Sequence, residues 1–336
     1  MEVFPDLLQR LAWSVWRGVY GPLGTWFCRL ALIGGVCSLL WNNFRESFIP
    51  SYRMEAITLD LSSEPRTLFF RTYGRCSFID EVSRALATFP PFILERFAGH
   101  QGDQRLYFQS LCDADFDREY GEITSYRGFF SLSGGIRLRA SLARSEVYGI
   151  SLHEGYHALS DYLVSEDGKV TTFEELVRSS LGAHRETQLE LARTAFEGLL
   201  RDPTVRMDEG LLVPEREQGL RAAFGRIAFF YGKGVFIPLE QDQAKRDLGH
   251  PLIHAALERY FVSDYALWRD VEYPDPRCTT EYFAEAGRAF VMDPCGLQIK
   301  DEKLFAAFQR LDNDLRASVS DPATLARNFS SALEAK

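Results

Sequence analysis

The 336-residue chain contains no run of basic residues and no CxxC motif, and each absence excludes a class of protein. Its 38 Lys and Arg residues are outnumbered by 47 Asp and Glu residues, so the formal net charge is −9 at pH 7. Because phosphate neutralisation needs a basic surface, nucleic acid is not expected as a partner. The spacing of the six cysteines predicts no thiolate zinc site. With 46% hydrophobic residues, the chain is expected to be globular with a sizeable core.

The sequence also lacks a long uncharged hydrophobic run, so the pattern alone does not decide whether the N-terminus crosses a membrane. The run at residues 30–41 is shorter than the roughly 20 residues that span a bilayer, but residues 19–41 are long enough if Arg29 is tolerated. Basic residues ahead of the run resemble a signal anchor and favour a membrane-anchored or extracytoplasmic location, and no small-residue cleavage site follows it. Two alternatives for this leader, residues 1–50, remain open: a membrane anchor and a buried or interfacial amphipathic helix.

The strongest chemical signal is the segment SLHEGYHALSD, residues 151–161, which contains the motif HExxH. In a helix, His153 and His157 lie one turn apart on the same face, close enough for two ring nitrogens to bind one tetrahedral zinc ion. Glu154 then lies beside the metal, where its carboxylate can act as a general base toward a water molecule. A pair of core histidines satisfied by hydrogen bonds is the alternative interpretation of the same pattern.

The residues around the motif predict a buried helix that follows a β-hairpin. Leu152, Tyr156, Leu159 and Leu163 form an apolar stripe at helical spacing. Ahead of them, the segment RGFFSLSGGIRLRASLARSE has a glycine pair that is typical of a hairpin turn. A strand in this place can bind an extended substrate at the edge of a sheet. Two further strands are expected between residues 52 and 78, and most of the second half reads as helix.

A catalytic zinc ion usually has three protein ligands, so the motif needs a third. The best candidate lies in CTTEYFAEAGRAFVMDP, residues 278–294, which is typical of a helix that begins at a threonine cap and ends before proline. Glu281 and Glu285 are four residues apart and share one face of this helix. One carboxylate can bind zinc while the other holds the free ring nitrogen of a histidine ligand. An ordinary helix face on which both acids pair with Arg288 is the alternative.

Together these two segments resemble the gluzincin metallopeptidases, and specifically the anthrax lethal factor-like catalytic domain. HEGYHALSDY is similar to the motif helix of that family, and TEYFAEAGRAF is similar to its later helix. The resemblance covers about residues 126–293. It implies these roles: zinc ligands His153, His157 and Glu281, general base Glu154, and Glu285 as the residue that orients a ligand histidine.

Two features depart from the family pattern. The family has a tyrosine that donates a hydrogen bond to the developing oxyanion, and Tyr273 stands near that place but one residue further upstream. The segment between His157 and Glu281 is also much longer than in the simplest members, which predicts a helical insertion at about residues 167–265. Three residues nearer to the motif therefore remain open as the third ligand: Glu174, Glu175 and His184.

The expected fold class is α+β, a zincin-like metallopeptidase with a small N-terminal sheet, an HExxH helix and a mostly helical second half. Residues 51–300 would form the metallopeptidase domain, and residues 301–336 a helical C-terminal tail. The expected function is a Zn²⁺-dependent peptidase that hydrolyses peptide or protein substrates with Glu154 as general base. The alternative is a non-catalytic metal- or peptide-binding protein of the same fold. It would be favoured if another histidine filled the fourth metal position, for which the candidates are His184, His250 and His254.

Overall fold

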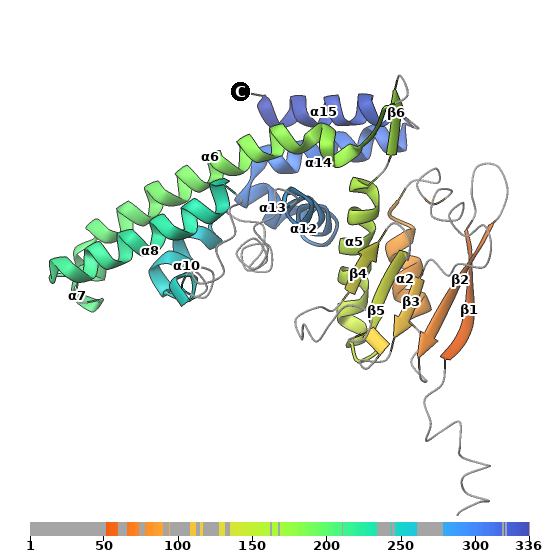
Figure 1. Cartoon of the computed structure of the whole chain (residues 1–336), viewed down its shortest axis with the longest axis horizontal. Coiled ribbons are helices and arrows are strands. Elements are labelled where there is room, and N and C mark those ends of the chain that lie inside the picture. The colour runs from red at the N-terminus through yellow and green to blue at the C-terminus, as the bar shows by residue number, and fades with distance from the viewer. Residues whose placement is uncertain are drawn as a thin grey trace, which may run out of the picture. The chain divides into compact units, whose positions relative to one another are not determined.

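The computed structural model of the chain describes most of the second half and selected segments of the first half (Figure 1). Two predicted features, the membrane segment at residues 19–41 and Tyr273, lie outside the described residues. Within the described part of the chain, no helix is both long and apolar enough to cross a membrane. The described residues are 52–59, 66–73, 78–89, 94, 108–111, 115–116, 128–131, 135–161, 163–166, 169–209, 211–233, 243, 246–260, 278–317, 319 and 321–335.

The chain divides into two compact units. The first comprises residues 1–53 and 73–75, and in it the ring centroids of Tyr52 and Tyr73 lie 5.1 Å apart. The second comprises residues 54–72 and 76–336. It contains the motif segment and all of the described helices.

The first part of the chain forms a five-stranded mixed sheet with the strand order β1-β2-β3-β5-β4. Its strands are β1 (Tyr52–Leu59), β2 (Arg66–Tyr73), β3 (Phe108–Leu111), β4 (Gly128–Ser131) and β5 (Gly135–Arg139). Strand β3 is parallel to β2 and to β5, whereas β4 and β5 form an antiparallel hairpin. Gly135, with a φ of 72°, lies where the turn enters β5, and Ile136 and Leu138 are fully buried in the core. The predicted hairpin ahead of the motif is therefore confirmed.

The second part of the chain is mostly helical, so the protein is broadly α+β, as predicted. Its helices are α5 (Arg144–Ser160), α6 (Phe173–Arg201), α7 (Pro203–Asp208), α8 (Pro214–Lys233), α10 (Pro251–Glu258), α12 (Cys278–Met292), α13 (Pro294–Lys300), α14 (Glu302–Arg316) and α15 (Pro322–Glu334). A further helix, α2 (Ile79–Leu86), precedes β3, and a two-stranded sheet of β6 (Leu163–Glu166) and β7 (Lys169–Thr172) joins α5 to α6.

The motif helix ends earlier than the apolar pattern predicts. Helix α5 stops at Ser160, and Leu163, which the predicted stripe includes, is the first residue of β6. The hydroxyl of Ser160 and the backbone N–H of Asp161 both donate to the carbonyl oxygen of His157, at 2.7 and 3.0 Å. These bonds close the last turn, and the antiparallel pairing of β6 with β7 then supplies the backbone hydrogen bonds that a longer helix would have made.

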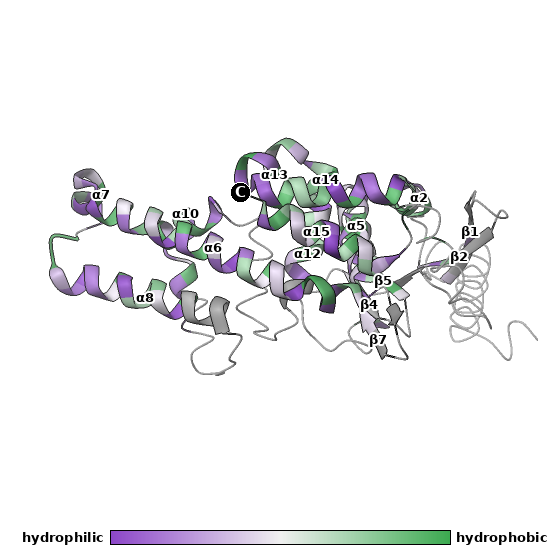
Figure 2. Ribbon diagram, turned by 90° about the horizontal axis from the view of Figure 1, so that it is seen from above, coloured by the Kyte–Doolittle hydropathy of each residue, from purple (hydrophilic) through white to green (hydrophobic). Residues whose placement is uncertain are grey.

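Helices α6, α7, α8 and α10 occupy the region, residues 167–265, where the sequence predicts a helical insertion. The described residues of this region are mostly helical, while its status as an insertion into a family fold stays a prediction. Helix α6 has 29 residues and begins at a capping box, in which Thr172 and Glu175 each accept a hydrogen bond from the other's backbone N–H. An ion pair between Arg206 and Glu217 (2.8 Å) joins α7 to α8. Figure 2 shows hydrophilic and hydrophobic residues along both α6 and α8, as expected for helices that bury one side.

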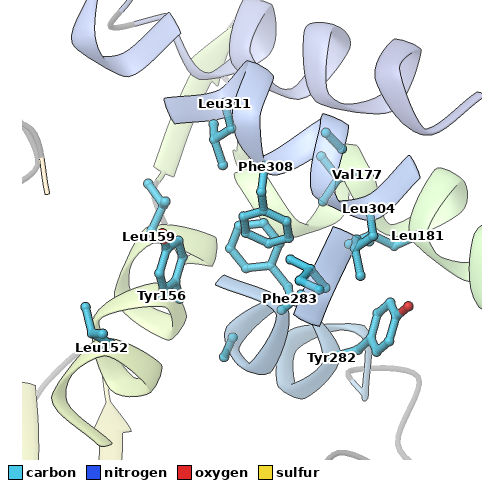
Figure 3. Close-up of a cluster of buried hydrophobic side chains, with 14 of the residues drawn as sticks. Leu152, Tyr156, Leu159, Val177, Leu181, Tyr282, Phe283, Leu304, Phe308 and Leu311 are labelled. Carbon is cyan, nitrogen blue, oxygen red and sulfur yellow. The ribbon is translucent and has the colours of Figure 1, made fainter. Parts of the chain in front are cut away.

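An aromatic cluster in the core joins the motif helix to the C-terminal helices (Figure 3). The ring centroid of Tyr156 in α5 lies 6.0 Å from that of Phe283 in α12 and 5.8 Å from that of Phe308 in α14. The ring of Phe329 in α15 packs edge-on against Phe308 at 5.3 Å. Helices α14 and α15 lie at residues 301–336, where the sequence predicts a helical C-terminal tail, and they belong to the same compact unit as the motif helix.

Candidate metal centre

The motif helix α5 packs against the sheet, against α2 and against α12. At its N-terminus, the carboxylate of Glu146 accepts a hydrogen bond from the backbone N–H of Ala143 (3.1 Å). Arg144 in the first turn pairs with Glu81 of α2 (3.2 Å). The first contact favours a helix start at this point, because the carboxylate satisfies an N–H that has no partner within the helix, and the second holds the first turn of α5 against α2. The motif residues follow about two turns later, in the buried part of α5.

Three potential ligand atoms converge between α5 and α12. The Nε2 atoms of His153 and His157 lie 3.0 Å apart, and Oε2 of Glu281 lies 3.3 Å from the first and 3.5 Å from the second. A tetrahedral zinc ion with bonds of about 2.0–2.1 Å keeps its ligand atoms about 3.3–3.4 Å apart, so the observed separations fit such an ion. Among the described residues, these three form the group whose ligand atoms are close enough to share a metal.

The carboxylates around His153 and His157 favour a positive charge at this position. Oε2 of Glu281 is buried and has no hydrogen-bond donor of suitable geometry among the described residues, although a buried carboxylate oxygen ordinarily needs one. Burial raises the pKa of Glu281, but the nearby rings of His157 and His153 outweigh burial and hold the pKa well below its usual range. Burial lowers the pKa of His153, but Glu281 and Glu285 outweigh burial and raise the pKa to about 10. The carboxylates therefore stabilise a cation between them, and a metal ion is one such cation.

Glu285 fixes the orientation of the first histidine. Nδ1–H of His153 donates a hydrogen bond to Oε1 of Glu285 (2.7 Å), and Glu285 is 2% exposed. Because an ionised carboxylate can only accept, the ring proton lies on Nδ1. The lone pair of Nε2 then points toward His157 and Glu281, as a metal ligand requires.

Glu154 is 5% exposed and stands next to His153 in the chain. Its carboxylate lies against Gly128, the first residue of β4, because a Cβ atom built there would be 2.8 Å from Oε1 of Glu154. The same Cβ would be 2.6 Å from Cγ2 of Ile150, so a side chain at residue 128 would displace its neighbours. Strand β4 ends the strand order, which places the Glu154 carboxylate at an edge of the described sheet.

Two glycines let the elements of the site approach closely. A Cβ atom on Gly287 of α12 would lie 2.4–2.6 Å from three ring carbons of Tyr156, the fourth residue of the motif. A Cβ atom on Gly155, the third residue of the motif, would lie 2.6 Å from the ring of Phe89. Neither role was predicted from the sequence, because a glycine inside a helix shows there only as a weak helix former.

The three alternative ligands on α6 have other partners. Glu174 lies 3.4 Å from the guanidinium of Arg178. Glu175 belongs to the capping box that starts the helix. His184 pairs with Asp301, with 2.6 Å between Nε2 and Oδ2. In the structure, Glu281 thus lies beside the two motif histidines, whereas the three candidates nearer to the motif in sequence contact other residues.

The other two histidines considered for a fourth metal position are also engaged elsewhere. His250 caps α10 by accepting a hydrogen bond from the backbone N–H of Leu252 (3.3 Å). His254 lies 3.7 Å from Glu258 one turn later in the same helix. Neither belongs to the group of potential metal ligands among the described residues.

No protein-family model, curated protein or solved structure matches the chain. The resemblance to the gluzincins therefore stays a prediction, as does the oxyanion role of Tyr273, which lies outside the described residues. The function of the protein is accordingly inferred from the geometry of the group formed by His153, His157 and Glu281.

Proposed function

We propose that the protein is a zinc-dependent peptidase with a zincin-like fold, in which His153, His157 and Glu281 hold the metal. The observation that carries the proposal is the convergence of two Nε2 atoms and one carboxylate oxygen at 3.0–3.5 Å from one another. Two nitrogens and one oxygen form a common ligand set of catalytic zinc, which keeps a fourth position open for water or substrate. Glu285 supports this assignment, because it holds the single proton of a neutral His153 ring on Nδ1 and leaves Nε2 for the metal.

A zinc ion bound by these residues would supply Lewis acidity, which polarises a carbonyl group and lowers the pKa of a bound water molecule. Glu154 provides the complementary proton chemistry. Its carboxylate accepts the proton that the attacking water gives up and then delivers this proton to the nitrogen of the departing amine. Because Glu154 is buried and its carboxylate lies against Gly128, the surrounding residues limit the movement of the proposed proton acceptor.

Strand β4 is the proposed binding edge for the substrate. It is the last strand in the order of the described sheet, and an extended peptide is proposed to add to it as a further strand. The first residue of β4, Gly128, touches the carboxylate of Glu154. A peptide aligned along β4 would therefore lie next to Glu154, the proposed general base. This position favours cleavage of the bound peptide over binding without cleavage.

The proposal is tested with a variant that removes the base and keeps the metal ligands. Purified wild type should contain about one zinc per chain and should cut members of a peptide library. The variant Glu154→Gln should retain zinc and lose about 10²- to 10⁴-fold in cleavage rate. Glu190→Gln is the matched control, because Glu190 is an exposed glutamate of α6, and this variant should cleave like wild type.

Three results would contradict the proposal in different ways. A zinc-loaded Glu154→Gln variant with full activity would show that Glu154 is not the base. A wild-type protein that neither contains zinc nor binds it on titration would show that His153, His157 and Glu281 are not a metal site. Retention of zinc with no cleavage of any library member would favour the non-catalytic alternative.

A further inference from the structure

We propose that Arg288 is a positioning residue of the metal site, which acts on His153 through Glu285. This inference rests on the proposed zinc site. Each oxygen of Glu285 contacts one of these two residues: Oε1 accepts from Nδ1–H of His153, and Oε2 accepts from the guanidinium of Arg288, each at 2.7 Å. A carboxylate bound at both oxygens cannot rotate freely, so Arg288 helps to set the plane in which Glu285 meets the imidazole.

Because Glu285 is buried, Arg288 also contributes a compensating charge. Glu285 is 2% exposed, and a buried carboxylate is costly unless a charged or hydrogen-bonding partner compensates it. A histidine that binds a metal is neutral and therefore offers Glu285 a hydrogen bond without a full positive charge. Arg288 carries a permanent positive charge in direct contact with Glu285, so it compensates the carboxylate in the metal-bound state.

The path of the Arg288 side chain connects the two helices of the site. Glu281, Glu285 and Arg288 follow one another at helical spacing along the side of α12 that packs on α5. The stem of Arg288 passes near Gly149, one turn before His153 in α5, where a built Cβ atom would lie 3.8 Å from Cδ of the arginine. The side chain is 32% exposed, so the chain of contacts leads from the protein surface to the proposed ligand.

The test measures the zinc affinity of metal-free protein by competition with a chelating dye, with the visible spectrum of the cobalt-substituted protein as a second readout. Arg288→Gln should weaken zinc binding about 10- to 100-fold and shift the cobalt spectrum, as changes in residues that orient a metal ligand do. Arg288→Lys should recover part of the loss, because lysine restores the charge without the planar pair of donors. Arg193→Gln is the matched control: Arg193 pairs with Glu190 at the same spacing of three residues on the exposed side of α6, and this variant should bind zinc like wild type.

A double variant distinguishes a positioning role from a general effect on stability. In a Glu285→Gln background, Arg288→Gln should cause no further loss of zinc affinity, since the arginine acts through the carboxylate. Unchanged affinity and spectrum in Arg288→Gln, or an equal loss in both backgrounds, would overturn the inference while leaving the zinc site intact. Failure of wild type itself to bind zinc would instead overturn the proposed function, and the inference with it.

Discussion

Replacing Gly287 by alanine should push apart the two helices that carry the candidate metal ligands. The added Cβ atom would lie 2.4–2.6 Å from ring carbons of Tyr156, whereas carbon atoms in contact are about 3.5–4.0 Å apart. The new methyl group therefore needs about 1 Å of additional space. The ring of Tyr156 cannot supply it, because the rings of Phe89, Phe283 and Phe308 surround it at centroid distances of 5.3, 6.0 and 5.8 Å.

The expected magnitude is set by two opposing effects. Overpacking a core typically costs about 1–3 kcal/mol, and the shortness of this contact places Gly287→Ala at the upper end. The better helix propensity of alanine offsets roughly 1 kcal/mol of that cost. We expect a net loss of about 1–2 kcal/mol in the free energy of unfolding. Since metal sites tolerate deviations of only about 0.2 Å, a shift of α12 that moves Glu281 should also lower zinc affinity by about tenfold or more.

Denaturant unfolding of the metal-free protein and a zinc competition titration check both effects. Gly198→Ala in α6 is the matched control, because Gly198 is exposed and a Cβ there meets no atom within 4 Å. In this control the free energy of unfolding should rise by about 0.5–1 kcal/mol, and zinc affinity should equal that of wild type. In a Tyr156→Leu background the cost of Gly287→Ala should shrink. Wild-type stability and zinc affinity in Gly287→Ala would refute the reasoning, since the close contact would then not set the helix separation.

Two further predictions concern buried polar groups. Asp301 accepts a hydrogen bond from His184 at 2.6 Å and caps α14 by accepting another from the backbone N–H of Leu304. Asp301→Ala should therefore lower the free energy of unfolding by about 3–5 kcal/mol without changing zinc affinity. An unfolding midpoint at the same denaturant concentration as wild type would contradict this. The pKa of His153 is raised from 6.5 to about 10, so its contribution to the stability of the metal-free protein is complete below pH 6.5 and is lost as the pH rises toward 10. Unfolding free energies measured across this range should therefore fall more steeply for wild type than for His153→Asn, and identical profiles would show that the raised pKa is not a property of the folded state.

The candidate site residues could be predicted from sequence because their spacing is local. His153 and His157 are one helical turn apart, and so are Glu281 and Glu285, so helical periodicity alone decides which of these side chains share a face. Two acidic residues one turn apart on an otherwise apolar helix are also a chemical signal, since buried carboxylates need partners. These two arguments suffice to bring four residues into one hypothesis before any contact is known.

The contact between the two helices could not be predicted in the same way, because it depends on packing between distant segments. Gly287 makes room for Tyr156, and neither residue shows in the sequence that the other is its neighbour. The end of the motif helix was also missed, because Leu163 continues the helical spacing while strand pairing after Ser160 overrides it. Local patterns thus identified the elements, and tertiary contacts decided their limits and arrangement.

The proposed metal site is assembled from segments that lie far apart in the chain, since His153 and Glu285, the residue that orients its ring, are 132 positions apart. A ribosome makes the N-terminal segment first, so α5 leaves it long before α12 exists. A chain that stops before α12 carries the histidine motif without Glu281 or Glu285. Under the proposed function, a chain that lacks α12 could not yet cleave peptides, and this ability would arise only after α12 has been made.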